Sequence, residues 1–145
     1  MKIVIGCDHG GFALKQDIIK HLQDKGYEVE DLGSYTPDRV DYPDYAKKVG
    51  EAVAAGKAEQ GILICGTGLG MSIAANKIHG IRAAVCCDCY SAEKAREHNN
   101  ANVLCLGARV LGSGLALQIV DAYLGASFLG SYHTLRVQKI MDLEK

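Results

Sequence analysis

Short apolar runs alternate along the chain with longer stretches in which apolar positions recur at helical spacing. The short runs are rich in Val, Ile and Leu and predict strands at 2–6, 27–32, 61–65, 82–87 and 103–107. The longer stretches predict helices at 10–25, 42–56, 69–79, 91–99, 112–124 and 131–144. Strands that alternate with helices are typical of a parallel sheet with helices on both faces. The pattern therefore predicts an α/β fold.

The last predicted helix follows a loop of small residues, GASFLGS at 125–131, and carries Tyr132, His133 and Arg136. This arrangement is compatible with an arm that docks on a neighbouring subunit. The alternative is an ordinary C-terminal helix packed on its own domain, and the sequence alone slightly favours this packed helix.

Length and composition fit a single domain over residues 1–145. A chain of 145 residues is long enough to bury a core, and 48% hydrophobic with 23% charged residues is ordinary for a folded protein. The net charge is −1 and the 16 Lys and Arg residues are scattered, so no basic stripe predicts nucleic-acid binding. The first residues predict a strand rather than a signal peptide, and no apolar run is long enough for a membrane span. We therefore expect a cytoplasmic protein.

Most of the cysteines lie in or just after the apolar runs, where cysteine often serves as a small hydrophobe. The six are Cys7, Cys65, Cys86, Cys87, Cys89 and Cys105. A disulfide framework is not expected in a core-rich cytoplasmic chain of this size. Cys86 and Cys89 form a CxxC pair, but no second pair or nearby His completes a four-ligand zinc site. The sequence therefore predicts no metal.

Polar and chemically active residues follow the predicted strands. In an open parallel sheet, ligands bind beyond the carboxyl ends of the strands. We expect two His, two Asp, a Cys, a Thr and an Arg to converge at that edge. These are Asp8, His9, Cys65, Thr67, Asp88, His98 and Arg109.

The strand at 61–65 ends on Cys65 and is followed by Gly66, Gly68 and Gly70. Glycines let backbone N–H groups approach a ligand closely, and amides at a helix start favour negative charge. Such a turn suits a phosphate or an oxyanion formed during reaction. It also favours the thiolate form of a neighbouring cysteine, which is the reactive form.

Structural interpretations compete for each of these residues taken alone. A cysteine at a strand end is usually inert, His98 at a helix end is usually a surface or capping residue, and Asp8 with His9 could simply cap the helix that follows. Their combination at one sheet edge favours a site.

Two other functions would also explain the glycine-rich turn. The GTGLG segment resembles a dinucleotide fingerprint, with Asp88 placed as the ribose-binding acid. However, the third glycine of that fingerprint is replaced by Met71, and the motif follows the third strand rather than the first. The phosphate loop GxxxxGK[ST] is absent. A non-catalytic nucleotide- or phosphate-binding module would explain the glycines but not the thiol and histidine beside them.

Five segments resemble the type B ribose-5-phosphate isomerases, relatives of the allose-6-phosphate and galactose-6-phosphate isomerases. They are GCDHGG at 6–11, DYP at 41–43, GILICGTGLGMSIAANK at 61–77, GIRAAVC at 80–86 and REHNNANVLCLGARV at 96–110. The resemblance implies a Rossmann-like three-layer α/β/α sandwich with a five-stranded parallel sheet. It also implies a homodimer or a dimer of dimers with active sites between subunits, and no metal or organic cofactor.

The implied reaction interconverts ribose 5-phosphate and ribulose 5-phosphate through an ene-diolate, a step of the pentose phosphate pathway. The resemblance makes Cys65 the proton-transfer base, while His98 and Asp8 open the sugar ring. The ene-diolate oxygens are held by Thr67 and by the backbone amides of Gly66, Gly68, Leu69 and Gly70. The remaining substrate-binding residues implied are His9, Asn99, Arg109 and Arg136.

Departures within the family bear on the substrate. One branch places its base as a Glu downstream of the strand, but here that region is Leu69, Gly70, Met71 and Ser72, which leaves Cys65. The galactose-6-phosphate branch tends to lose the equivalent of His98 or to alter the GTG block, and because both are intact here the resemblance favours ribose 5-phosphate. The last helix normally begins GGRHxxRV, whereas this chain has GSYHTLRV. Tyr132 therefore replaces an expected arginine, and we include it among the candidate phosphate-binding residues.

Overall fold

The computed structural model describes all 145 residues and has one five-stranded parallel sheet, in the order β2-β1-β3-β5-β4. The strands are β1 (Lys2–Cys7), β2 (Glu28–Asp31), β3 (Gln60–Cys65), β4 (Ala83–Val85) and β5 (Val103–Gly107). A short 3-10 turn, η1 (His9–Gly11), leads into α1 (Phe12–Asp24). The other helices are α2 (Tyr42–Ala54), α3 (Leu69–Ala75), α4 (Cys89–Glu97), α5 (Ser113–Leu124) and α6 (Tyr132–Asp142). The predicted α/β class and five-stranded parallel sheet are confirmed.

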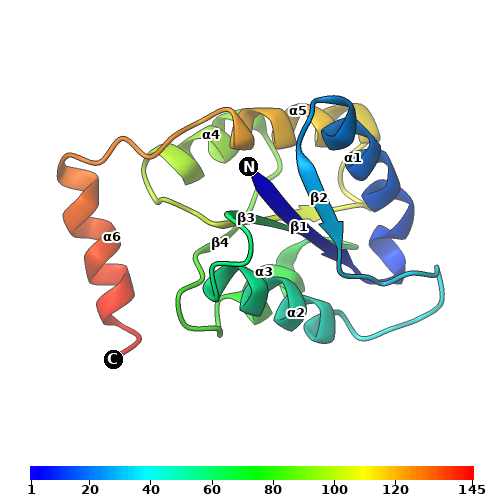
Figure 1. Cartoon of the computed structure of the whole chain (residues 1–145), viewed down its shortest axis with the longest axis horizontal. Helices are drawn as coiled ribbons and strands as arrows, with labels where there is room; N and C mark the ends of the chain where they lie inside the picture. The colour runs from blue at the N-terminus through cyan, green and yellow to red at the C-terminus, as the bar shows by residue number, and fades with distance from the viewer.

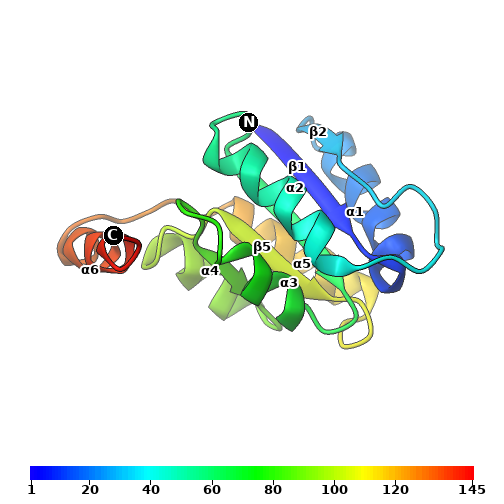
Figure 2. The ribbon, with the colours of Figure 1, turned by 90° about the horizontal axis from the view of Figure 1, so that it is seen from below.

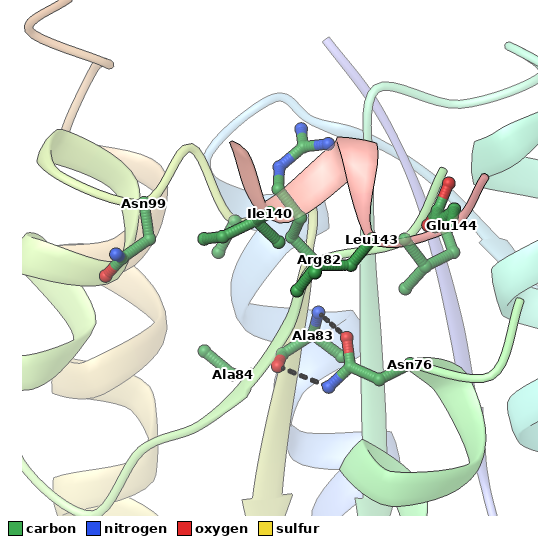
Figure 3. A pocket seen from close by; sticks show the side chains of 10 residues that line it. Asn76, Arg82, Ala83, Ala84, Asn99, Ile140, Leu143 and Glu144 are labelled. Atoms are coloured by element: carbon green, nitrogen blue, oxygen red, sulfur yellow. Dashed lines mark hydrogen bonds between the residues drawn. The ribbon is translucent and has the colours of Figure 1, made fainter. Parts of the chain in front are cut away.

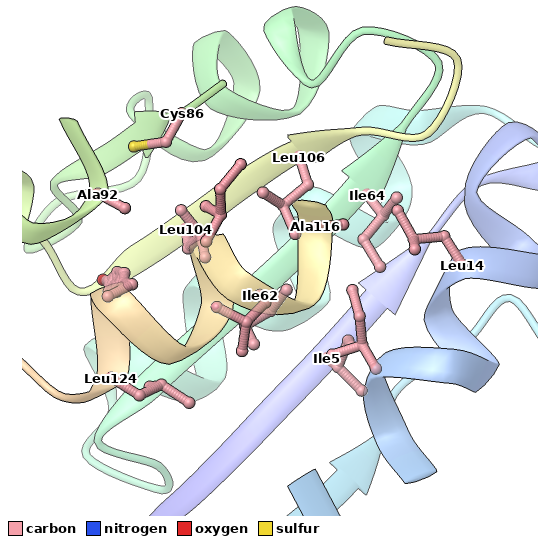
Figure 4. Close-up of a cluster of buried hydrophobic side chains, with 14 of the residues drawn as sticks. Ile5, Leu14, Ile62, Ile64, Cys86, Ala92, Leu104, Leu106, Ala116 and Leu124 are labelled. Carbon is pink, nitrogen blue, oxygen red and sulfur yellow. The ribbon is translucent and has the colours of Figure 1, made fainter. Parts of the chain in front are cut away.

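The sheet separates two hydrophobic cores, because successive strand residues point to opposite faces. On one face, Ile5 and Ile64 belong to a cluster that α1, α4 and α5 cover (Figure 4). On the other, Leu63 and Cys65 belong to a smaller cluster under α2 and α3. Figure 1 shows these two helical layers above and below the sheet. The result is the expected three-layer sandwich.

The predicted element boundaries agree with the structure to within a few residues, and the largest difference concerns α3. The pattern predicts this helix to residue 79, but it ends at Ala75. The side chain of Asn76 turns to β4, donating to the carbonyl of Ala83 at 2.9 Å and accepting from its amide at 2.8 Å. Asn76 thus satisfies the outer edge of the sheet instead of continuing the helix.

Helix α6 stands apart from the sandwich at the end of an extended connection (Figures 1 and 2). It is tied to the body near both ends. The amide of Leu129 donates to the carbonyl of Glu97 at 3.0 Å, and the amide of Gly80 donates to the Glu144 carboxylate at 3.0 Å. Between these ties Leu135 remains exposed. The geometry of α6 therefore resembles an arm more than a packed helix.

No helix of the structure has the length and apolar character needed to cross a membrane.

Glycine at position 61 of β3 lets α2 pack closely on the sheet. A Cβ at this position would lie 2.6 Å from Cγ1 of Val49 and 3.2 Å from Cγ2 of Val53. We therefore expect Gly61→Ala to lower the free energy of unfolding by about 1–3 kcal/mol through overpacking. Chemical denaturation measures this loss. Gly112→Ala is the matched control, because a Cβ there meets no atom within 4 Å. Equal stability of the two variants would contradict the packing explanation.

Candidate active site

The strand order has a switch point at the carboxyl ends of β1 and β3, which we call the crevice. The chain leaves β1 toward β2 on one side, while β3 lies on the other. In open α/β sheets ligands bind at such a switch point, because the connecting segments diverge there. β1 ends at Cys7, just before Asp8, and β3 ends at Cys65.

Asp8 is nearly buried and is held by the backbone of η1. Its Oδ1 accepts the amides of Gly10 at 2.9 Å and Gly11 at 3.2 Å. Its Oδ2 accepts no hydrogen bond within the chain, so one carboxylate oxygen is fixed and the other is available. Asp8 thus caps the turn, as its structural interpretation predicts, and still has one oxygen without a hydrogen-bond partner in the chain.

His9 is oriented by the loop that precedes α2. Its Nδ1 accepts the amide of Val40 at 3.3 Å. Because a backbone N–H can only donate, the neutral ring carries its proton on Nε2. His9 therefore presents a donor, the group suited to a phosphate oxygen.

Cys65 lies at the start of the glycine turn and is only 5% exposed. Its Sγ accepts the amide of Gly68 at 3.1 Å. Gly68 has a φ of +80°, a conformation that glycine adopts without strain. Since α3 has only seven residues, the Cys65 sulfur meets this single amide rather than the end of a long helix.

Arg109 joins Asp8 and the glycine turn around Gly10. A Cβ on Gly10 would lie 3.3 Å from Oδ1 of Asp8, 3.4 Å from the amide nitrogen of Gly66 and 3.6 Å from Nη2 of Arg109. The backbone of Arg109 is fixed by donating to the carbonyl of Gly66 at 2.9 Å. A carboxylate, a free amide and a guanidinium therefore meet at one point that only glycine leaves open.

The rest of the glycine turn faces solvent beside this point. Thr67 Oγ1 accepts the amide of Leu69 at 3.3 Å, which leaves the hydroxyl hydrogen free to be donated. The ring of Tyr42 lies over Gly70, where a Cβ would come within 2.5 Å of the ring. The structure thus brings together eight predicted site residues, namely Asp8, His9, Cys65, Gly66, Thr67, Gly68, Gly70 and Arg109, with Leu69 exposed at the rim.

His98 does not join this group, and the expectation that it converges there is wrong for a single chain. Helix α4 starts at the carboxyl edge after β4 and returns to the opposite edge, where His98 caps it. Nine helical residues span about 13 Å at the rise of an α-helix. The error lies in treating the end of a helix like the end of a strand.

His98 instead belongs to a second polar cluster with α6. Its ring stacks on His133 with centroids 4.2 Å apart and an interplanar angle of 13°. The rings of Tyr132 and His133 are tilted by 38° with their centroids 4.2 Å apart, and the guanidinium of Arg136 lies 5.0 Å from the Tyr132 ring centroid. Burial lowers the pKa of His133, and the neighbouring His98 and Arg136 charges lower it further.

Asn99 borders a groove between the end of α6 and the start of β4. This groove has a volume of about 560 Å³ (Figure 3). Asn76, Arg82 and Ile140 line it beside Asn99. Asn99 therefore lies at the same sheet edge as His98, away from Cys65.

The hydrogen bonds of Asp88 are made within α4 and not with the crevice residues. The carboxylate of Asp88 accepts the amide of Ser91 at 2.7 Å and the hydroxyl of Ser91 at 2.9 Å, so Asp88 caps α4.

The cysteine pair after β4 shows no sign of a metal site. Burial raises the pKa of the Cys86 thiol to about 11. No three His, Cys, Asp or Glu side chains are grouped so as to hold a metal ion.

Comparison with known proteins identifies the family. The model of the Ribose/Galactose Isomerase family matches residues 3–140. The chain belongs to this family. It is 54% identical to "Ribose-5-phosphate isomerase B" of Escherichia coli over 99% of this chain and 97% of that protein. It is 49% identical to "D-erythrulose-4-phosphate isomerase" of Pectobacterium atrosepticum, over 97% and 93% of the two chains.

A solved structure agrees with this assignment. Ribose-5-phosphate isomerase B from Mycoplasma genitalium, with bound ribulose 5-phosphate, superimposes with a TM-score of 0.96 at 43% identity, over 99% of this chain and 95% of that one. The resemblance to the type B ribose-5-phosphate isomerases and the isomerase class are therefore confirmed.

Sequence reasoning left two site neighbours out of its candidates. Tyr42 lies in the DYP segment that carries part of the family resemblance, but its ring contact with Gly70 depends on how the preceding loop folds. His133 lies between the candidates Tyr132 and Arg136, and its stack on His98 joins helices far apart in sequence.

The lowered pKa of His133 predicts that α6 loosens in acid. The folded chain favours the neutral ring, so its stabilisation is complete above the ordinary histidine value of 6.5 and is lost as pH falls through the lowered value. Hydrogen exchange of the 132–142 segment, corrected for intrinsic rates, should show lost protection between pH 7.5 and 5. In His133→Phe this acid-induced loss should be much smaller. Equal losses in both proteins would contradict the assignment to His133.

Proposed function

We propose that the chain interconverts ribose 5-phosphate and ribulose 5-phosphate with Cys65 as the proton-transfer base. The observation that carries this proposal is the contact between the Cys65 thiol and the amide of Gly68, beside Asp8 and Arg109 in one crevice. Two of the compared relatives are named for ribose 5-phosphate, and one of these holds ribulose 5-phosphate. A non-catalytic phosphate-binding module would not explain a thiol at this place.

In the proposed step the Cys65 thiolate removes the proton from C2 of the open-chain aldose. The electrons move to the C1 carbonyl and give an ene-diolate, whose negative oxygen the turn amides and the Thr67 hydroxyl stabilise. The thiol then returns the proton to C1. A further proton passes from the O2 hydroxyl to O1, so the ketose has the same atoms as the aldose. Neither metal nor organic cofactor is needed for this balance.

Ring opening requires an acid and a base on the closed sugar, and we assign it to His98 and Asp8. Since His98 lies at the opposite sheet edge from Cys65, we propose that a second copy of the chain supplies it. The exposed α3 residues Leu69 and Ile73 and the exposed Leu135 of α6 offer apolar surface for such a dimer. Two copies related by a two-fold axis would complete two equivalent sites. A dimer of dimers is compatible with the same interface.

The phosphate is assigned to donors from both clusters. His9 and Arg109 come from one chain, and Asn99, Arg136 and Tyr132 come from the second. A tyrosine hydroxyl gives a neutral hydrogen bond of about 1 kcal/mol, whereas a charge-assisted one contributes about 1.5–3 kcal/mol. We therefore expect a weaker phosphate grip than in a relative with two arginines on α6, with Arg136 correspondingly more important.

The alternatives are other sugar phosphates, because one compared relative is named for the ketose phosphate erythrulose 4-phosphate and the family is named for ribose and galactose isomerases. Allose 6-phosphate and galactose 6-phosphate are the six-carbon candidates. We place the reaction in the cytoplasm, as a step of the pentose phosphate pathway.

An isomerase assay across the phosphates of ribose, erythrulose, allose and galactose tests the proposal. Ribose 5-phosphate should give the highest kcat/KM, and chelator should leave it unchanged. Cys65→Ala should lower kcat by about 10²- to 10⁴-fold, the usual contribution of a general base. The exposed Cys87→Ala is the matched control and should keep full activity. Turnover of none of these sugars would contradict the proposed reaction, and near-full kcat in Cys65→Ala would remove Cys65 as the base.

A further inference from the structure

Lys15 of α1 is a fully buried ammonium group close to the crevice. Its Nζ donates to Oδ1 of Asp31 at 2.7 Å and to the carbonyl of Ser34. The rings of Phe12 and Tyr35 each lie 5.6 Å from the same nitrogen. Lysine is rarely buried completely unless it is paired, and the charged partner of this one is Asp31, whose side chain is 29% exposed. The chain therefore keeps a buried ion pair at a place where apolar side chains of similar volume often give equal or greater stability.

The groups that Lys15 binds belong to the last residue of β2 and to the segment that follows it. This segment continues alongside β1 beyond the last strand pair. The amide of Leu32 donates to the carbonyl of Ile5 at 2.8 Å, and the amide of Ser34 donates to the carbonyl of Cys7 at 2.9 Å. Asp31 Oδ1 also accepts the amide of Gly33 at 2.9 Å. Lys15 therefore fixes the start of the loop over 32–41 directly beside Asp8.

Near its end, the same loop contacts the ring of His9. Within the loop, the hydroxyl of Ser34 donates to the carbonyl of Thr36 at 3.2 Å, and the amide of Asp38 donates to the hydroxyl of Thr36 at 3.3 Å. The next ordered contact is the amide of Val40 with Nδ1 of His9. Short-range contacts thus connect the buried ammonium to the imidazole of His9, whose Nδ1 accepts this amide.

We propose that Lys15 is a positioning residue for His9: its buried ammonium holds the loop over 32–41, and that loop fixes the orientation and tautomer of the His9 ring. Lys15 itself touches no substrate. The inference deepens the proposed function, because it rests on His9 as a phosphate donor. Loss of Lys15 should weaken binding of the phosphate while leaving the proton transfer at Cys65 intact.

A double-mutant cycle tests this coupling. Lys15→Met keeps the apolar stem and removes the ammonium. With ribose 5-phosphate it should raise KM about tenfold, as expected for one lost hydrogen bond to phosphate, and change kcat little. In a His9→Ala background the same substitution should change KM no further, because the two residues act through one contact. Lys20→Met on the same helix, at an exposed lysine, is the matched control and should change neither constant.

An unchanged KM in folded Lys15→Met, or the same increase in KM with and without His9, would overturn the proposal. If Lys15→Met does not fold, Asp31→Asn carries the same test, because it weakens the anchor at a partly exposed side chain. Nitrogen-15 spectra of His9 test the contact without turnover. The folded variant should show a mixture of tautomers where the parent chain shows protonated Nε2, and an unchanged spectrum would count against the coupling. A parent chain that turns over no sugar phosphate would contradict the proposed function instead.

Discussion

The direction of the chain through the parallel sheet decides where every functional group lies. All five strands end at one edge, and each helix that follows returns the chain to the other edge. Residues at or just after the ends of strands, such as Cys65 and Asp8, therefore gather in the crevice between β1 and β3. Residues that follow helices, such as His98, gather at the opposite edge. A reaction that needs both sets cannot be completed within one copy of this chain unless the fold changes.

Close backbone approach shapes the crevice itself. The carboxylate of Asp8, the amide of Gly66 and the guanidinium of Arg109 meet around Gly10, and the amide of Gly68 donates to the Cys65 thiol. The buried Lys15 holds the loop that orients His9, although burial of its charge costs desolvation free energy. The strand ends supply the reactive groups, and the surrounding backbone contacts set their direction.

The sequence allowed the strands, the sheet type and the crevice residues to be predicted, because these depend on local patterns. Val-, Ile- and Leu-rich runs mark buried strands, and polar residues just after them mark the carboxyl edge. The place of His98 was predicted wrongly, because a helix reverses the direction of the chain before the residue is reached. The end of α3 was missed because Asn76 finds its partners on β4, which lies close only after folding. The contacts of Lys15, Tyr42 and His133 likewise join segments that no local pattern relates.

The division of the site between two copies is tested most directly by mixing inactive variants. Asp8→Ala and His98→Ala proteins, each inactive alone, should recover activity after subunit exchange, because each hybrid dimer has one intact site. Random exchange in a two-fold dimer predicts recovery of about a quarter of the parent activity. Asp8→Ala mixed with Cys65→Ala is the control and should recover none, since both residues lie at the same edge of one chain. No recovery in the first mixture, with exchange verified by native mass spectrometry, would contradict a shared site.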